Sequence, residues 1–407
     1  MIDFCLKVRR VLLPTLLIAA VVSGCQQKPA ATVSDPSSPH AMEKLDITHT
    51  LLIGSYTPAA PSLDADGKPL PLSEGIYAVG FDASTKNLGE PVLIAKTHNP
   101  SWLSLSPSNQ TVYAVDEKDP GELNSFRWFS EKPRASLIDS KASGGASPCH
   151  AALSPDMQYL AVGNYMGGNL AVFKVDTETG VPASEPQLRQ HRGNGPNKNR
   201  QEAPHAHWVG WNNTGDILYA VDLGIDTVMG YRFNAVNGEL GEGFVAFKAA
   251  AGAGPRHMVF DKAGSHAYIV NELANTVSVV RVTASGEFVE QQNLSSLPRD
   301  FSEHSQSAHI QLSADGAHLY VSNRGHNSIA VFQVAVDGGL SLSQTFSTQG
   351  KWPRGFLLLD DAKVLFVVNE ESNSLVLLDV NSDGLLSFSG RKWDLGQPTY
   401  IGLWQEK

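Results

Sequence analysis

A short apolar run closed by polar residues recurs along most of the chain. Clear examples are "VYAVDE" (112–117), "AYIVNE" (267–272) and "LYVSNR" (319–324). Seven copies occur, at residues 51–56, 112–117, 160–165, 218–223, 267–272, 319–324 and 365–370. Apolar runs of this length, rich in Val and Tyr and bounded by turn residues, predict β-strands. Their regular recurrence predicts a repeat architecture.

A second apolar pattern, such as "GPRHMVF" or "SAHIQLS", precedes most copies of the first. The copy at 51–56 lacks it, and the missing unit stands at the other end of the chain as "QPTYIGLW" (397–404). A ring whose first repeat takes its inner strand from the chain's end has no open sheet edge. The spacing of the copies suits four-stranded blades. The sequence therefore predicts an all-β, seven-bladed β-propeller closed by pairing of the C-terminal strand with the N-terminal blade.

Polar residues recur at two positions of the predicted blades. Alignment of the second patterns places four of the 13 histidines at one position, namely His150, His207, His257 and His309. The residue that closes the first pattern follows this position by 15 residues in five blades, and it follows His207 by 16 residues. Charged residues at this closing position include Glu272 and Arg324. Because an unpaired buried charge costs several kcal/mol, we expect these side chains to point into a polar central channel. In an alternative interpretation they only pair with one another and hold water.

The N-terminus has the pattern of a targeting segment. Residues 1–24 combine a basic stretch, "KVRR", with the apolar "VLLPTLLIAAVV" and small residues before Cys25, which predicts a signal peptide. Small residues before a cysteine resemble the bacterial lipobox, which implies that Cys25 is lipidated and anchors the protein to a membrane. Residues 25–46 are predicted to be a disordered tether, and 47–407 the propeller. Gln26 resembles the sorting residue of outer-membrane lipoproteins, so we expect the periplasmic face of the outer membrane.

Composition excludes several classes of function. The formal net charge is −10 and no basic tract is present, which disfavours a nucleic-acid partner. No Gly-x-Ser-x-Gly or His-Glu-x-x-His motif occurs, which argues against a serine hydrolase or a zinc protease.

With Cys5 removed and Cys25 lipidated, Cys149 has no intrachain partner for a disulfide. Cys149 and His150 are adjacent on a strand and should point to opposite faces, which argues against a Cys-His nucleophile. No cofactor or metal is expected, because histidines on separate blades lie too far apart for one ion.

Three segments carry a family resemblance: "RGNGPNKNRQEAPHAHWVGW" (192–211), "GAGPRHMVFDKAGSHAYIVNELANTVSVV" (252–280) and "LYVSNRGHNSIAVF" (319–332). They resemble the seven-bladed propeller lactonases, a family with propeller-type 6-phosphogluconolactonases and carboxy-cis,cis-muconate lactonizing enzymes. The resemblance covers roughly residues 47–404. It implies a site at one mouth of the channel with four catalytic residues: His207, Arg256, Glu272 and Arg324. Nearby side chains are expected to contact the substrate, namely His205, His257, His309 and Arg354.

Opening a lactone requires a base to take a proton from water and positive charge to meet the developing oxyanion. His207 or Glu272 is the expected base, and Arg256 and Arg324 are the expected anion binders. The resemblance implies hydrolysis of a sugar-acid lactone, and the expected envelope location favours an unphosphorylated aldonolactone. Two alternatives stay open. One is a muconolactone-type intramolecular lyase (cycloisomerase), and the other is a non-catalytic envelope binding propeller.

Overall fold

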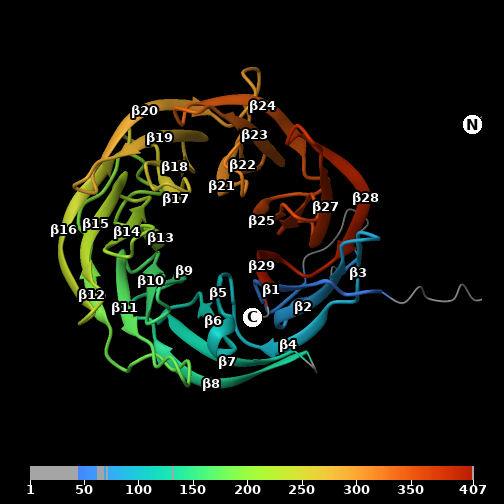
Figure 1. Ribbon diagram of the computed structural model, residues 1–407, viewed down its shortest axis with the longest axis horizontal. Helices are drawn as coiled ribbons and strands as arrows, with labels where there is room; N and C mark the ends of the chain where they lie inside the picture. The colour runs from blue at the N-terminus through green and yellow to red at the C-terminus, as the bar shows by residue number, and fades with distance from the viewer. Residues whose placement is uncertain (1–44, 62–67, 70–71, 131–132, 406–407) are drawn as a thin grey trace, which may run out of the picture. The chain divides into compact units, whose positions relative to one another are not determined.

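The computed structural model describes residues 45–61, 68–69, 72–130 and 133–405. Within them the chain forms seven antiparallel sheets in a ring, numbered here as blades 1–7 in chain order (Figure 1). The prediction of an all-β, seven-bladed propeller is confirmed. The helical element within the described residues is one 3-10 turn, η1 (Pro107–Asn109). The signal peptide (1–24), Cys25 and the tether up to residue 44 lie outside the described residues, and these expectations stay predictions.

The strands follow in chain order. Blade 1 contains β29 (Pro398–Trp404), β1 (His49–Ser55), β2 (Gly75–Asp82), β3 (Asn87–Leu88) and β4 (Val92–Lys96). Blade 2 contains β5 (Leu103–Ser106), β6 (Thr111–Asp116), β7 (Glu122–Phe129) and β8 (Arg134–Ala142), and blade 3 contains β9 (Pro148–Leu153), β10 (Tyr159–Asn164), β11 (Asn169–Lys174) and β12 (Gln187–Gln190). Blade 4 contains β13 (Ala206–Trp211), β14 (Ile217–Asp222), β15 (Thr227–Asn234) and β16 (Glu239–Lys248), and blade 5 contains β17 (Pro255–Phe260), β18 (His266–Asn271), β19 (Thr276–Val282) and β20 (Phe288–Ser295). Blade 6 contains β21 (Gln306–Leu312), β22 (His318–Arg324), β23 (Ser328–Val334) and β24 (Leu340–Ser347), and blade 7 contains β25 (Pro353–Leu359), β26 (Val364–Asn369), β27 (Ser374–Val380) and β28 (Leu386–Asp394).

The ring closes through the last strand of the chain. β29 pairs antiparallel with β1, with Trp404 opposite Thr50 and Tyr400 opposite Gly54. β29 thereby becomes the inner strand of blade 1, as the displaced "QPTYIGLW" unit predicts, and lies beside β25, the inner strand of the last blade, in Figure 1. Closure removes the free inner edge that β1 would otherwise present to other chains.

The apolar runs are continuous because each sheet packs on both faces against a neighbouring blade. β6, β14 and β26 are buried at every residue. Tyrosines of successive blades link them further, since the hydroxyls of Tyr219, Tyr268 and Tyr320 donate to the carbonyls of Gly286, Gly338 and Gly384 at 2.8, 3.1 and 2.8 Å. A buried Tyr usually finds a partner for its hydroxyl, and in these three blades the carbonyl of the next blade supplies it.

A β-bulge opens the inner strand of most blades. In blade 5, Pro255 lies opposite Asn271 and His257 opposite Val270, so Arg256 is the extra residue. In blade 4 the extra residue is His207, because Ala206 pairs with Asp222 and Trp208 with Val221. Corresponding bulges occur at Cys149, Arg354 and Thr399. A bulge re-aims the side chains around it, so adjacent residues no longer alternate strictly between faces.

The bulge corrects the alignment of the histidines. His207 is equivalent to Arg256, not to His257, and Trp208 takes the place of a histidine in blade 4. The spacing of 16 residues between His207 and Leu223 is consistent with this shift, because Arg256 also lies 16 residues before Glu272. The bulge at Cys149 also removes the argument that strand alternation separates Cys149 from His150.

Candidate active site

The residues at the level of His257 meet across the ring axis. The ring of Trp102 in blade 2 lies 5.4 Å from that of His257 in blade 5 and 5.9 Å from that of His309 in blade 6, between ring centroids. It also lies 4.1 Å from His150 and 4.8 Å from Tyr400. Blades so far apart around the ring come together only at its axis. The expectation of a polar channel is therefore wrong at this level of the axis. Packed rings fill the axis there, and we call them the aromatic layer.

Hydrogen bonds fix the tautomers of two histidines in the aromatic layer. Nη1 of Arg256 lies 3.1 Å from Nε2 of His257, and a guanidinium only donates, so this nitrogen accepts. His257 then carries its proton on Nδ1, which lies 3.2 Å from Nδ1 of His309. Burial, with Arg256 next, lowers the pKa of His257 far below its usual range and that of His309 to about 3. Both imidazoles are therefore neutral near pH 7.

Next to this layer, three arginines surround Glu272, which follows β18. Nη2 of Arg200 lies 2.5 Å from Oε1 of Glu272, while Nε of Arg256 and Nη2 of Arg324 lie 2.9 and 2.8 Å from Oε2. Arg256 and Glu272 are 2% and 1% exposed. Burial by itself would raise the pKa of Glu272, but attraction to Arg324, Arg256 and Arg200 holds it well below its usual range. This arginine cluster has an excess of two positive charges.

The arginine cluster retains hydrogen-bonding capacity. Nε of Arg256 and Nη2 of Arg324 both lie against Oε2 of Glu272, so one carboxylate oxygen serves two guanidinium groups. The excess positive charge suits an anionic group such as a carboxylate or an oxyanion.

Arg200 is a member of this cluster that the sequence analysis does not identify. It lies on the segment between β12 and β13, and Nη2 also donates to the Tyr165 hydroxyl at 3.3 Å. Buried Gln201 anchors the segment by donating to the carbonyl of Leu223 at 2.9 Å and to the Asp226 carboxylate at 2.7 Å. Comparison of repeats could not reveal Arg200, because only blade 4 has this segment in front of it.

The two histidines of the "PHAH" motif have different surroundings. The His207 ring lies 5.4 Å from Tyr165 and 5.2 Å from His257, and burial, then Arg256, lowers its pKa far below the usual range. His205 stacks on Tyr165 at 4.4 Å, and its Nδ1 lies 3.0 Å from the Tyr165 carbonyl. His205 therefore braces Tyr165. The Cys149 sulfur lies 3.8 Å from Nδ1 of His207, but burial raises the thiol pKa, which disfavours a nucleophilic thiolate.

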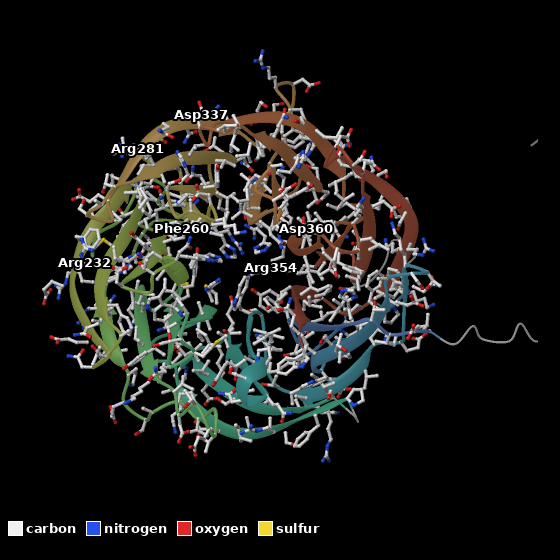
Figure 2. All side chains as sticks on the ribbon, in the orientation of Figure 1. Arg232, Phe260, Arg281, Asp337, Arg354 and Asp360 are labelled. Carbon is white, nitrogen blue, oxygen red and sulfur yellow. The ribbon has the colours of Figure 1, made fainter. Side chains whose placement is uncertain are left out.

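A second charged group lies beside the arginine cluster. Arg354 lies 3.7 Å from Glu117 and 3.8 Å from Glu370, measured from Nη2 and Nη1 to the Oε2 atoms. Its guanidinium carbon lies 5.0 Å from the centroid of the Tyr56 ring, and the Tyr56 hydroxyl lies 3.1 Å from both oxygens of Glu117. We call these four residues the acidic cluster. Figure 2 shows Arg354 near the centre of the ring and Arg281 at its outer rim.

Trp352 connects the two clusters. The Arg324 guanidinium lies 5.3 Å from the centroid of the Trp352 ring, and the backbone N–H of Glu370 donates to the Trp352 carbonyl at 3.0 Å.

Of the eight expected site residues, Arg256, Glu272 and Arg324 thus meet directly, and His207, His257 and His309 lie next to them. His205 contacts the cluster through Tyr165, and Arg354 belongs to the adjacent acidic cluster.

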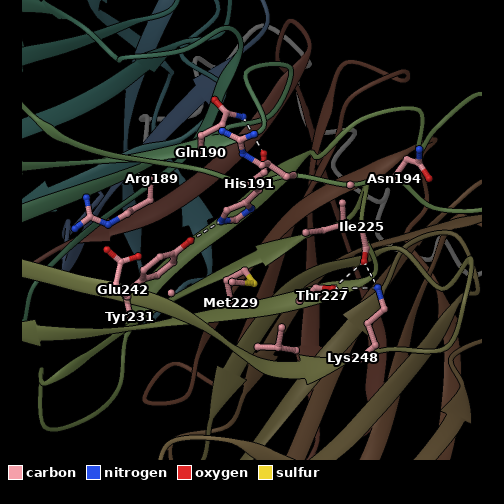
Figure 3. Close-up of a pocket in the computed structure, with 14 residues that line it drawn as sticks. Arg189, Gln190, His191, Asn194, Ile225, Thr227, Met229, Tyr231, Glu242 and Lys248 are labelled. Atoms are coloured by element: carbon pink, nitrogen blue, oxygen red, sulfur yellow. Dashed lines mark hydrogen bonds between the residues drawn. The ribbon is translucent and has the colours of Figure 1, made fainter.

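A cavity of about 480 Å³ lies away from these groups, at β12, β15 and β16 (Figure 3). His191 lines it, but its ring nitrogens are occupied by Asp222 at 2.6 Å and by the Tyr231 hydroxyl at 3.0 Å. Lys248 donates to the Ile225 carbonyl at 2.5 Å. Because these polar groups are already paired, the clusters at the axis are the better candidate for chemistry.

Two further searches cover only the described part of the chain. Among residues 45–61, 68–69, 72–130 and 133–405, no three His, Cys, Asp or Glu side chains converge as a metal-binding set. Nor does that part of the chain contain a helix of the length and apolarity that crossing a membrane requires.

Comparisons with known proteins bear on the family and the fold. Residues 50–403 match the family model described as "Lactonase, 7-bladed beta-propeller". A 6-phosphogluconolactonase of Bacillus subtilis (strain 168) is 37% identical over 311 residues, covering 75% of this chain and 87% of the relative. One from Formosa agariphila is 32% identical over 339 residues, covering 80% and 91%. The structure of a periplasmic gluconolactonase from Pseudomonas aeruginosa has a TM-score of 0.79 at 27% identity, covering 88% of this chain and 99% of that one. The chain therefore belongs to the lactonase family of seven-bladed β-propellers.

Proposed function

We propose that this protein hydrolyses a sugar-acid lactone at the arginine cluster. The observation that carries the proposal is the gathering of three guanidinium groups around the one buried carboxylate of Glu272, which leaves two excess positive charges in the cluster. When water attacks the lactone carbonyl, negative charge develops on its oxygen. Donors that are already in place stabilise that charge without reorganisation. The names of the Bacillus and Formosa relatives support the same reaction class.

In this mechanism Glu272 holds the three arginines in position. A carboxylate whose pKa lies well below its usual range is a weak proton acceptor, and both oxygens of Glu272 face guanidinium groups. His207 is neutral near pH 7 and is also a weak base, because its pKa is lowered. We assign His207 to hydrogen bonding with the substrate and the arginines to the oxyanion and the product carboxylate.

The acidic cluster favours an unphosphorylated substrate. Glu117 and Glu370 place two carboxylates beside the arginine cluster. Carboxylates accept hydrogen bonds from sugar hydroxyls but repel a phosphate dianion. The Pseudomonas aeruginosa neighbour is named a periplasmic gluconolactonase, which supports the same substrate class. We propose a glucono-δ-lactone-like substrate and an envelope location, with a lipid anchor on Cys25 at the periplasmic face of the outer membrane.

The test compares initial hydrolysis rates of glucono-δ-lactone and its 6-phosphate, corrected for spontaneous opening. A saturable rate with a higher kcat/KM for the unphosphorylated lactone is expected. A preference for the 6-phosphate would overturn the proposed substrate, whereas the proposed hydrolysis of a lactone would stand. No rate above the spontaneous one with either lactone would overturn hydrolysis and favour the lyase or binding alternatives.

A further inference from the structure

The repeat places the same pair of residues in blades 5 and 7. In each, an arginine at the bulge lies 16 residues before a glutamate that follows the second strand: Arg256 and Glu272, then Arg354 and Glu370. The surroundings of the two glutamates differ. Glu272 is in close contact with three guanidinium groups, whereas Glu370 approaches one guanidinium to only 3.8 Å.

Arg354 forms no hydrogen bond with either carboxylate of the acidic cluster. A bidentate arginine–carboxylate pair has N–O distances of about 2.7–2.9 Å. The distances from Arg354 to Glu117 and Glu370 are 3.7 and 3.8 Å. Arg354 therefore supplies positive charge to two carboxylates but compensates only one of them.

The two carboxylates also differ in their hydrogen bonds. Glu117 accepts from the Tyr56 hydroxyl, which lies 3.1 Å from each of its oxygens. Oε2 of Glu370 is buried and has no hydrogen-bond partner within the described residues. Hydrogen bonds to the charged form lower the proton affinity of a carboxylate. Of this pair, Glu370 is therefore the carboxylate whose buried oxygen lacks a hydrogen bond to its charged form.

The other charged groups around Glu370 agree with this assignment. Burial is the largest influence and raises the pKa of Glu370, while Arg354 and Arg324 lower it. Glu117 and Glu371 raise it again, and the pKa of Glu370 lies above its usual range as a result. A carboxylate with a raised pKa is a better general base than one with a lowered pKa.

We propose that Glu370 is the proton-transferring residue of lactone opening in this protein. The inference rests on the proposed function. Glu370 accepts a proton from water as the water oxygen bonds to the carbonyl carbon. When the bond from that carbon to the ring oxygen breaks, Glu370 returns the proton to the ring oxygen, which becomes the hydroxyl of the product. One water is consumed, and the new carboxylic acid ionises to leave a carboxylate beside Arg256 and Arg324.

The experiment measures kcat against pH for glucono-δ-lactone with the full chain and with Glu370→Gln. We expect kcat to fall about 100-fold in Glu370→Gln. The decline of kcat toward acid pH, which reports protonation of the base, should disappear. The matched control is Glu185→Gln, an exposed glutamate before β12 that is not among the charged groups acting on Glu370, and it should keep the wild-type rate and profile.

A second variant moves the pH profile without removing the proposed base. Glu117→Gln removes a negative charge beside Glu370, so the acidic decline of kcat should shift to lower pH, whatever the effect of the variant on the plateau rate. This shift would not accompany a purely structural role. If the wild type is active and Glu370→Gln has the same rate and the same acidic decline, the role of Glu370 would be overturned, whereas the proposed function would stand. An inactive wild type would overturn both.

Discussion

The neutral histidines of the aromatic layer make the stability of the propeller depend on pH. In the unfolded chain a histidine titrates near pH 6.5. In the folded protein, burial and then Arg256 lower the pKa of His309 to about 3. Between these values the unfolded chain binds a proton that the folded protein does not. The free energy of unfolding therefore falls as the pH falls below about 6.5.

The size of the effect follows from linkage. Each such histidine contributes a slope of about 1.4 kcal/mol per pH unit, which amounts to about 2 kcal/mol between pH 7 and pH 5. Burial also lowers the pKa of His150, His207 and His257, so all four act in the same direction. Carboxylates titrate mainly below pH 5, and any contribution from Glu370, whose pKa is raised, is common to the wild type and to a histidine variant.

The assay is urea unfolding followed by tryptophan fluorescence at pH 7, 6 and 5. For His309→Gln we expect the loss of stability between pH 7 and pH 5 to be about 2 kcal/mol smaller than in the wild type. His304→Gln serves as the control, since His304 is exposed. The reasoning would be refuted by a pH slope in His309→Gln equal to that of the wild type, because His309 would then titrate alike in both states.

Three further predictions address the arginine cluster and the closure of the ring. Glu272→Gln leaves Arg256 and Arg324 buried without a counter-ion, and we expect a loss of about 3–5 kcal/mol in the free energy of unfolding; an unchanged melting temperature would contradict the ion-pair account. Arg200→Ala should lower kcat/KM for the lactone about 10-fold with little effect on stability, since the Arg200 side chain is 30% exposed and its charge adds to the anion site. Lys198→Ala on the same segment is the control, and equal rates for both variants would remove Arg200 from the site. A chain ending at residue 396 lacks β29 and exposes the edge of β1, so it should aggregate, as size-exclusion chromatography would show; a stable monomer would contradict closure through β29.

The fold could be predicted because every blade repeats the same signal. Seven apolar runs and the displaced "QPTYIGLW" unit determine both the number of blades and the closure. The charges of Glu272 and Arg324 could be singled out because they close the repeated apolar run, and Arg256 because the family resemblance implies it. Their direct contact in the structure matches that expectation.

Other features depend on geometry that one sequence does not contain. The bulge moves His207 by one position, and only pairing with β14 reveals it. Arg200 belongs to a segment without counterparts in other blades. Glu117 and Glu370 come from blades that are far apart in sequence, and they face the same guanidinium only because the ring closes. The aromatic layer likewise requires Trp102 to meet His257 across the axis.

The most direct test of the central claim is kcat/KM for glucono-δ-lactone, measured for the wild type, Arg256→Ala and the outer-rim control Arg281→Ala. The account predicts a loss of about 100-fold or more in Arg256→Ala and wild-type values in Arg281→Ala. Hydrolysis by Arg256→Ala at the wild-type rate would contradict the claim that the arginine cluster opens the lactone.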